Sequence, residues 1–354
     1  MKELKNDTFL KACKNLPVSR TPIWIMRQAG RYLPEYRAVR EKVDFSTLCK
    51  TPELAAQVTL QPVDILDVDA AIIFSDILVV PEAMGMKLEI IEDKGPVFEN
   101  PIRSLNDFKN LRKIDPVKDL KFVMDAVSVA KRELCGRVPL IGFCGSPWTL
   151  LTYMVEGKGS KSFSIIKKMI FDEPRLAHKI LDMLSEVCAD YLSAKIKAGA
   201  NAVQIFDTWG GILTPENFEE FSLHYIEKII SLIMKKDEPV IVFAKGVHQN
   251  LEKLAACGAD VISIDWTFEM GKVRKLIGDK VALQGNLDPA VLYANKEKIK
   301  VEAKKILKSY GHGSRHIFNL GHGILPDIDP ENVKTLVKFV KEESEKYHKE
   351  SAVC

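Results

Sequence analysis

The feature of this sequence that most constrains its fold is a regular alternation of short apolar segments with longer stretches of helical periodicity. Each apolar segment ends in polar or glycine-containing sequence, which is typical of a buried parallel strand. We predict eight such strands, over residues 22–26, 70–74, 138–143, 202–206, 240–244, 261–264, 281–283 and 316–319. Eight strand-helix units favour a closed barrel over an open sheet. The expected fold is therefore an α/β protein, a single (β/α)8 barrel of the TIM type, with residues 1–354 forming one domain.

Helices are predicted between these strands from periodicity and from helix-start signals. Apolar residues recur at three- and four-residue spacing over residues 117–135 and 173–200, as in the outer helices of a barrel. Thr51, Thr214 and Asp329 each directly precede a proline, the order expected where a helix begins.

One insertion and two terminal extensions are expected around this barrel. Residues 81–115 contain several glycine and proline turns, and we predict that they form a β-hairpin or lid inserted after the second strand, over the C-terminal face of the barrel. Residues 1–20 mix both charge signs and predict an N-terminal helical extension. Residues 341–354 are charged and predict a fraying C-terminal tail.

The composition gives no reason to expect a nucleic acid or a membrane as partner. Lys and Arg number 51 and Asp and Glu 48, so any recognition of anions must be local. The seven cysteines are scattered and form no CxxC motif, which argues against a disulfide framework or a zinc knuckle. The sequence offers neither a secretory signal nor an apolar stretch long enough to span a bilayer. We expect a soluble protein of the cytoplasm.

In a (β/α)8 barrel the active site lies at the carboxyl ends of the strands, so the residues that follow each strand are the candidates for chemistry. The first strand is followed by Arg27 and Arg31, separated by Gln-Ala-Gly. Two guanidinium groups on a turn at Gly30 suit a ligand rich in carboxylates. The alternative is that both arginines pair with Glu35 or with other surface acids.

Two further strand ends carry titratable groups. Asp76 closes an apolar strand, where a carboxylate is costly to bury without donors or cations. At a barrel mouth it can accept hydrogen bonds from ligand N–H groups and stabilise positive charge beside them; alternatively, it caps the following loop. His322 stands between two glycines and either faces a ligand or is a satisfied structural histidine.

Three other signals are weaker. The glycine-rich turns at 284–286 and 321–323 resemble the phosphate cradle that many barrels build after strands seven and eight. Cys144 occupies the nucleophile position of a Gly-x-x-x-Ser segment that is not a hydrolase elbow, so a thiol nucleophile is a minor alternative. The histidines have no cysteine or glutamate partner at a recognised zinc spacing, and no metal is predicted.

Taken together, these segments resemble the uroporphyrinogen decarboxylase family along nearly the whole chain. Residues 22–36 (PIWIMRQAGRYLPEY) are similar to the N-terminal signature of the family, and residues 142–154 (GFCGSPWTLLTYM) to its second signature. Residues 74–78, 284–289 and 319–324 also fit the family pattern in order and spacing.

The resemblance implies a homodimeric barrel that converts uroporphyrinogen III to coproporphyrinogen III and CO2 by four acetate-to-methyl decarboxylations, in haem biosynthesis and without metal or organic cofactor. It also implies a set of substrate-binding residues: Arg27, Gln28, Ala29, Gly30, Arg31, Asp76, Tyr153, Thr208 and His322. The catalytic residues among them would be Asp76, Arg27 and Tyr153. Thr208 is followed by Trp209 and Gly210, which differ from the forms expected in that loop.

The implied chemistry agrees with these residue types. A pyrrole acetate cannot lose CO2 directly, whereas a protonated pyrrole ring is a cationic electron sink that a fixed carboxylate such as Asp76 stabilises. The proton donor stays open, because arginine keeps its proton and tyrosine titrates near ~10. Arg27, Arg31 and Lys245 are the local cations that would recognise the carboxylates of the substrate.

Two other functions are considered. A corrinoid-linked methyltransferase on the same type of barrel would need zinc ligands of the His-x-Cys kind after the fifth strand and a cysteine after the eighth. The sequence has Lys245 and His322 at these places, which disfavours it. A non-catalytic tetrapyrrole-binding protein would have little need for an anion such as Asp76 facing the centre of its ligand.

Overall fold

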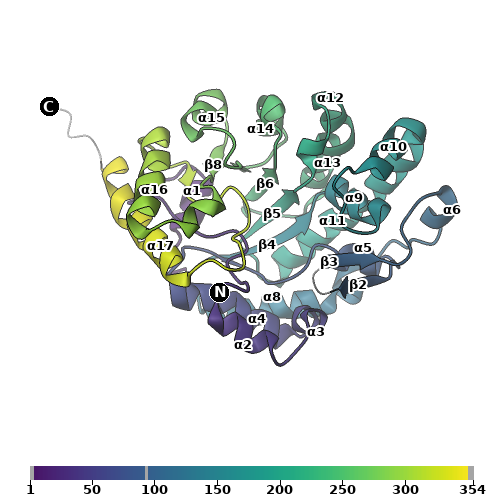
Figure 1. Cartoon of the computed structure of the whole chain (residues 1–354), viewed down its shortest axis with the longest axis horizontal. Helices are drawn as coiled ribbons and strands as arrows, with labels where there is room; N and C mark the ends of the chain where they lie inside the picture. The colour runs from purple at the N-terminus through teal and green to yellow at the C-terminus, as the bar shows by residue number, and fades with distance from the viewer. Residues whose placement is uncertain (1–3, 92–94, 350–354) are drawn as a thin grey trace.

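The core of the protein is one curled sheet of parallel strands surrounded by helices (Figure 1). The computed structural model describes residues 4–91 and 95–349. In this part of the chain the sheet has seven strands, hydrogen bonded in the order β1 (Ala71–Ile72), β4 (Leu140–Gly145), β5 (Ala202–Asp207), β6 (Val240–Ala244), β7 (Val261–Ser263), β8 (Ala282–Gln284) and β9 (His316–Ile317). All neighbouring pairs are parallel. These strands confirm the predicted α/β barrel architecture at seven of the eight expected places.

The remaining predicted strand, residues 22–26, is the first in chain order, and the prediction of a regular strand there is wrong. The segment nevertheless lies between the last and first strands of the sheet, where the eighth strand of a barrel is expected. Ile23 forms a single parallel bridge with Phe318, just after β9. On its other side the Ile23 carbonyl accepts the Asp69 N–H at 2.8 Å, just before β1. Side chains replace the rest of the ladder, because the Asp69 carboxylate and the Asn319 amide oxygen accept backbone N–H groups of this segment at 2.9 Å. The segment therefore links the two edges of the sheet.

The helices lie on the outside of this sheet. Those between the first segment and β4 are α2 (Pro34–Arg40), α3 (Phe45–Lys50), α4 (Pro52–Leu66), α5 (Val79–Ala83), α6 (Leu105–Phe108), α7 (Pro116–Asp119) and α8 (Lys121–Leu134). Those between β4 and β6 are α9 (Pro147–Glu156), α10 (Ser164–Asp172), α11 (Pro174–Ala198), α12 (Pro215–Phe218) and α13 (His224–Leu232). The last are α14 (Leu251–Ala255), α15 (Met270–Ile277), α16 (Lys296–Tyr310) and α17 (Pro330–Ser344).

The helix predictions are confirmed in position but not in every detail. The long helix predicted over 173–200 is α11, whereas the helix predicted over 117–135 is divided into α7 and α8 at Leu120. Thr214 and Asp329 cap their helices by accepting backbone N–H groups. Thr51 also occupies the N-cap position of its helix, with Pro52 at the helix start as predicted, but its side chain accepts no backbone N–H group.

The insertion after the first strand of the sheet contains the predicted hairpin, β2 (Leu88–Ile91) paired antiparallel with β3 (Gly95–Phe98). The insertion is anchored on the end of α9, because Phe98 N–H donates to the Gly157 carbonyl at 2.7 Å and Ile102 N–H to the Met154 carbonyl at 2.9 Å. It thereby covers the helix that carries Tyr153.

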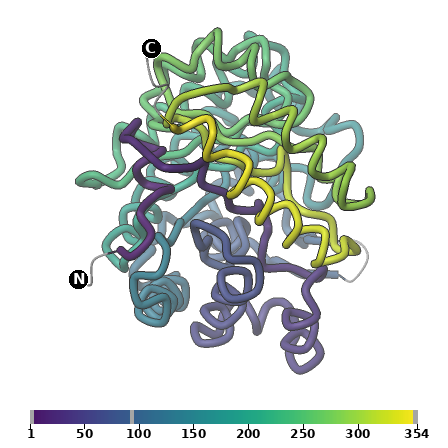
Figure 2. Tube along the Cα trace, turned by 90° about the vertical axis from the view of Figure 1, so that its left-hand side faces the viewer, coloured from purple at the N-terminus to yellow at the C-terminus, as the bar shows by residue number. Residues whose placement is uncertain are grey.

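Both terminal predictions need correction. The N-terminal extension contains only the short helix α1 (Thr8–Cys13) among the described residues of 1–20. The C-terminal tail does not start at 341, because α17 continues to Ser344 and a 3-10 turn follows, while residues 350–354 lie outside the described residues. The Ser344 hydroxyl accepts the Thr21 N–H at 3.0 Å, which fastens this end of the chain beside the N-terminal segment (Figure 2). Among the described residues there is no helix with the length and apolar character that crossing a membrane requires.

Candidate active site

A cavity of about 440 Å³ lies at the carboxyl ends of the strands. It is lined by residues that follow several different strands, which is the arrangement expected for a barrel active site. The structure brings together eight of the predicted substrate-binding residues along its wall: Arg27, Ala29, Gly30, Arg31, Asp76, Tyr153, Thr208 and His322.

Gln28 is the predicted binding residue that the structure places elsewhere. Its side chain is fully buried and does not line the cavity. Its amide donates to the Ala70 carbonyl at 3.0 Å and accepts the Ile25 N–H at 3.1 Å. Gln28 therefore joins the first segment to the edge of β1, and its assignment as a direct ligand residue is corrected to a structural one.

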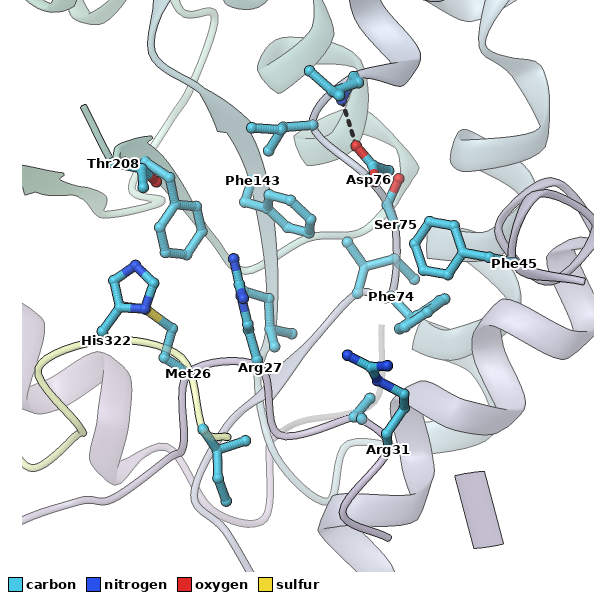
Figure 3. A pocket seen from close by; sticks show the side chains of 18 of the residues that line it. Met26, Arg27, Arg31, Phe45, Phe74, Ser75, Asp76, Phe143, Thr208 and His322 are labelled. Atoms are coloured by element: carbon cyan, nitrogen blue, oxygen red, sulfur yellow. Dashed lines mark hydrogen bonds between the residues drawn. The ribbon is translucent and has the colours of Figure 1, made fainter. Parts of the chain in front are cut away.

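Arg27 points into the cavity between Phe143 and His322 (Figure 3). Its backbone is left-handed, with φ of 64°, which turns the chain sharply at the end of the first segment. Gly323 makes room for its side chain, since a methyl group at Gly323 would lie only 2.7 Å from the Arg27 Cγ atom. The position of this guanidinium thus depends on a glycine almost three hundred residues away in sequence.

Arg31 reaches the same cavity from the start of the next turn (Figure 3). Among the described residues the ion-paired arginines are Arg20, Arg112, Arg132 and Arg137. Neither Arg27 nor Arg31 pairs with Glu35 or with another acid in that part of the chain, so the surface-pairing alternative is wrong. Two solvent-accessible guanidinium groups are available to anions.

Asp76 follows β1 and is partly buried at the cavity wall. Its Oδ1 atom accepts the Leu78 N–H at 2.7 Å, so the residue does cap its own loop while it faces the cavity (Figure 3). Burial raises the pKa of the carboxyl above its ordinary value, although the Leu78 N–H and the positive charge of Arg27 act in the opposite direction. A compensating positive charge in the cavity would therefore stabilise the ionised form.

Tyr153 and His322 add polar groups of different character. Burial raises the pKa of Tyr153, which lies on α9, so its hydroxyl keeps its proton in neutral solution. Burial lowers the pKa of His322 to about 4, and the nearby charges of Arg27 and Lys245 add to this effect. His322 is therefore a neutral hydrogen-bonding group at neutral pH.

An aromatic floor of the cavity was not anticipated from the sequence. Phe143, Phe206 and Phe243 lie near the carboxyl ends of the adjacent strands β4, β5 and β6 and line the cavity. The ring centroids of Phe143 and Phe206 are 5.6 Å apart, and those of Phe206 and Phe243 are 6.1 Å apart. The signal that could have revealed it is a phenylalanine near the carboxyl end of three consecutive predicted strands. Such a floor offers an apolar face to a flat or cup-shaped ring system.

A buried aspartate organises the loops on one side of this floor. Asp207, at the end of β5, accepts hydrogen bonds from the hydroxyl groups of Ser146, Thr149 and Ser222 at 2.7 to 2.8 Å. Ser222 belongs to a π-helical turn between α12 and α13, which brings its hydroxyl inward. Asp207 was not singled out from the sequence, because its partners are far apart along the chain.

Two of the weaker sequence signals, the thiol nucleophile and the phosphate cradle, are not supported. Cys144 is buried in the hydrophobic core and does not line the cavity, which contradicts a thiol nucleophile. The N–H groups of Gly285 and Gly321 donate to the carbonyls of Ile317 and Leu287 within the sheet region, so they do not form a phosphate cradle. Within residues 4–91 and 95–349, no cluster of three or more metal-ligating side chains occurs.

The sequence itself was compared with known families and proteins. The profile of the family described as uroporphyrinogen decarboxylase (URO-D) matches residues 4–343. This chain belongs to the uroporphyrinogen decarboxylase family. A protein from Chlorobium phaeovibrioides named uroporphyrinogen decarboxylase is 57% identical over 98% of this chain and its own full length. One of the same name from Hydrogenovibrio crunogenus is 53% identical over 99% of this chain and its own full length.

Solved structures agree on the fold. A methyltransferase from Methanosarcina mazei superimposes with a TM-score of 0.82 at 22% identity, covering 97% of this chain and 99% of its own. A B12-independent methionine synthase from Shewanella gives a TM-score of 0.56 at 14% identity, covering 85% of this chain and 91% of its own. These likenesses are too distant in sequence to indicate activity, and family membership rests on the sequence comparison.

Proposed function

We propose that this chain catalyses the decarboxylation of the four acetate side chains of uroporphyrinogen III to methyl groups, which yields coproporphyrinogen III and four CO2 in tetrapyrrole and haem biosynthesis. The observation that carries the proposal is the distribution of charge in the cavity. One carboxylate, Asp76, and two arginines without ion pairs in the described chain line a chamber with an aromatic floor. The activity named for the full-length relatives agrees with it.

The substrate matches this charge pattern. It carries carboxylates on its periphery and pyrrole N–H groups at its centre. Arg27 and Arg31 would bind peripheral carboxylates, because guanidinium groups bind them through paired, charge-assisted hydrogen bonds. Asp76 would accept the central N–H groups, while Thr208 and His322 would supply neutral hydrogen bonds at the opposite wall. Ala29 and Gly30 would let the backbone approach the ligand closely.

Asp76 would also stabilise the charge that develops during the reaction. A proton adds to the ring carbon that lies between the pyrrole nitrogen and the carbon bearing the acetate, which leaves a cation delocalised over the acetate-bearing carbon and the pyrrole nitrogen. The bond to the carboxylate then breaks, CO2 leaves, and the electron pair neutralises the ring as an exocyclic methylene. A second proton completes the methyl group, and the first proton leaves the ring. A fixed carboxylate beside the nitrogen lowers the energy of each cation.

Tyr153 and Arg27 are proposed to act at the reacting acetate. The Tyr153 hydroxyl, protonated in neutral solution, can donate a hydrogen bond or pass a proton through water. Arg27 does not give up its proton under ordinary conditions, so its role is to hold and orient the carboxylate. We propose that the reaction proceeds on these side chains, without a metal ion or an organic cofactor.

Several wider properties are part of the same proposal. We propose that residues 1–354 form one domain, that the protein is a homodimer, and that it acts in the cytoplasm without nucleic acid or membrane partners. The cysteines at 13, 49, 135, 144, 188 and 257 are all free, which supports a reducing compartment. Size-exclusion chromatography with light scattering would test the dimer.

The test of the activity is an anaerobic incubation of the purified protein with uroporphyrinogen III in the presence of a chelator, followed by mass analysis of the products. Stepwise loss of CO2 to the tetracarboxylate supports the proposal. Bound but unchanged substrate would instead indicate a tetrapyrrole-binding protein. Methyl transfer from a methylated donor, dependent on stoichiometric zinc, would indicate the methyltransferase alternative.

A further inference from the structure

The loop after β5 holds Trp209 rigidly beside the cavity. The Trp209 N–H donates to the Thr149 hydroxyl at 3.3 Å, and its carbonyl accepts the indole N–H of Trp148 at 3.0 Å. Thr149 is itself bound to the buried carboxylate of Asp207. Two hydrogen bonds therefore hold the backbone of Trp209 in place.

The indole ring of Trp209 has two aromatic neighbours. Its centroid is 4.7 Å from that of Phe163 and 6.2 Å from that of Tyr153, with the Tyr153 ring tilted by 60°. The indole Nε1 atom is shielded from solvent and has no hydrogen-bond partner among the described residues. A buried donor without an acceptor is uncommon and unfavourable, so an acceptor is expected in some state of the protein.

Tyr153 offers that acceptor. Burial raises the pKa of its hydroxyl, the adjacent Asp76 adds to this, and both the Trp209 indole N–H and the positive charge of Arg27 lower it. Of the two aromatic neighbours of the indole ring, Phe163 has no polar atom, so the phenolic oxygen of Tyr153 is the acceptor that this pair of side chains offers to the unpartnered indole N–H. A phenolic oxygen that accepts from the indole must direct its own O–H elsewhere, and the open side is the cavity.

We propose that Trp209 is a positioning residue for Tyr153, whose indole N–H donates to the phenolic oxygen when substrate fills the cavity and so aims the Tyr153 O–H at the reacting acetate. The inference rests on the proposed function, since it assigns a task to one side chain of the same site. It does not require Trp209 to touch the substrate. Trp209 would act through the orientation of a single proton.

The test removes the indole N–H and keeps the ring. Trp209→Phe is expected to lower kcat by roughly fivefold to tenfold, the factor that corresponds to one neutral hydrogen bond, with KM little changed. In a Tyr153→Phe background the same substitution should have no further effect, because its partner is absent. Replacement of Trp209 by benzothienylalanine, which has sulfur in place of N–H, repeats the test without altering ring size if the phenylalanine variant folds poorly.

A second readout does not depend on turnover. The pH midpoint at which the ¹³Cζ signal of Tyr153 titrates, followed by NMR with the tetracarboxylate product bound in the cavity, should be higher in both Trp209 variants than in the wild type. Phe163→Leu is the matched control, since it removes the other aromatic neighbour of Trp209 and leaves the N–H in place, and it should leave the titration unchanged. Additive effects in the double variant, or an unchanged tyrosine titration, would overturn the inference. A wild-type protein that binds but does not decarboxylate would refute the proposed function instead.

Discussion

The contact between Gly323 and Arg27 allows a sharp test of the site. Gly323 has no left-handed backbone, so alanine is sterically permitted there by the chain itself. The added methyl group would lie 2.7 Å from Arg27 Cγ and 2.8 Å from its Nε, where ordinary contacts exceed about 3.4 Å. The clash involves the stem of the side chain, so Arg27 must adopt a different rotamer.

The expected effect of Gly323→Ala is large on activity and small on stability. A charge-assisted hydrogen bond contributes about 1.5–3 kcal/mol, so loss of the Arg27 contact to a substrate carboxylate should lower kcat/KM by roughly 10- to 150-fold. The Arg27 side chain is exposed and free to move, so the free energy of unfolding should fall by less than about 1 kcal/mol.

The assay is the initial rate of anaerobic uroporphyrinogen decarboxylation, together with urea denaturation of each variant. Gly159→Ala is the matched control, because nothing lies within 4 Å of the added methyl group at that exposed position. A folded Gly323→Ala protein with the activity of the control would refute the reasoning that Arg27 must occupy this space for turnover.

Three further predictions concern charge and burial. Burial raises the pKa of Asp76, so the ionised carboxylate destabilises the folded state above that pKa, and this effect disappears below the ordinary value of 3.8. Thermal melts should therefore show that Asp76→Asn is at least as stable as the wild type at neutral pH. At acidic pH the variant should have no advantage. His322, with a pKa of about 4, should show no NMR titration near its ordinary value of 6.5, and a titration there would contradict its burial. Asp207→Ala leaves three buried hydroxyl groups without an acceptor, and urea denaturation should show a loss of about 3 kcal/mol or more; a loss below about 1 kcal/mol would contradict that network.

The short apolar runs of the sequence predicted the strands that form continuous ladders, because most residues of these buried strands are apolar or small and the residues are consecutive in the chain. The prediction failed at residues 22–26, where the Asp69 and Asn319 side chains replace part of the ladder, and at the C-terminal tail, where Ser344 meets Thr21. Such contacts join residues that are distant in sequence. No local pattern indicates them.

In the site too, features encoded by neighbouring residues could be predicted, and contacts between residues distant in sequence could not. Arg27 and Asp76 could be identified because a charged group directly after an apolar strand is conspicuous. Gln28 lies within the same motif, yet its side chain turns into the protein, which a one-dimensional motif does not specify. The room that Gly323 leaves for Arg27 arises only when the first and last segments of the barrel meet.

The most direct test of the account is a single-turnover measurement of CO2 release from uroporphyrinogen III by the wild type and by Asp76→Asn, with substrate binding measured on the same samples. Asparagine keeps the size of the side chain and its acceptor for the Leu78 N–H, and removes the negative charge. The account predicts that binding is largely retained while the rate falls by about 100-fold or more, as when a preorganised electrostatic group is lost. A rate close to that of the wild type would contradict the central claim that Asp76 stabilises a cationic pyrrole during decarboxylation.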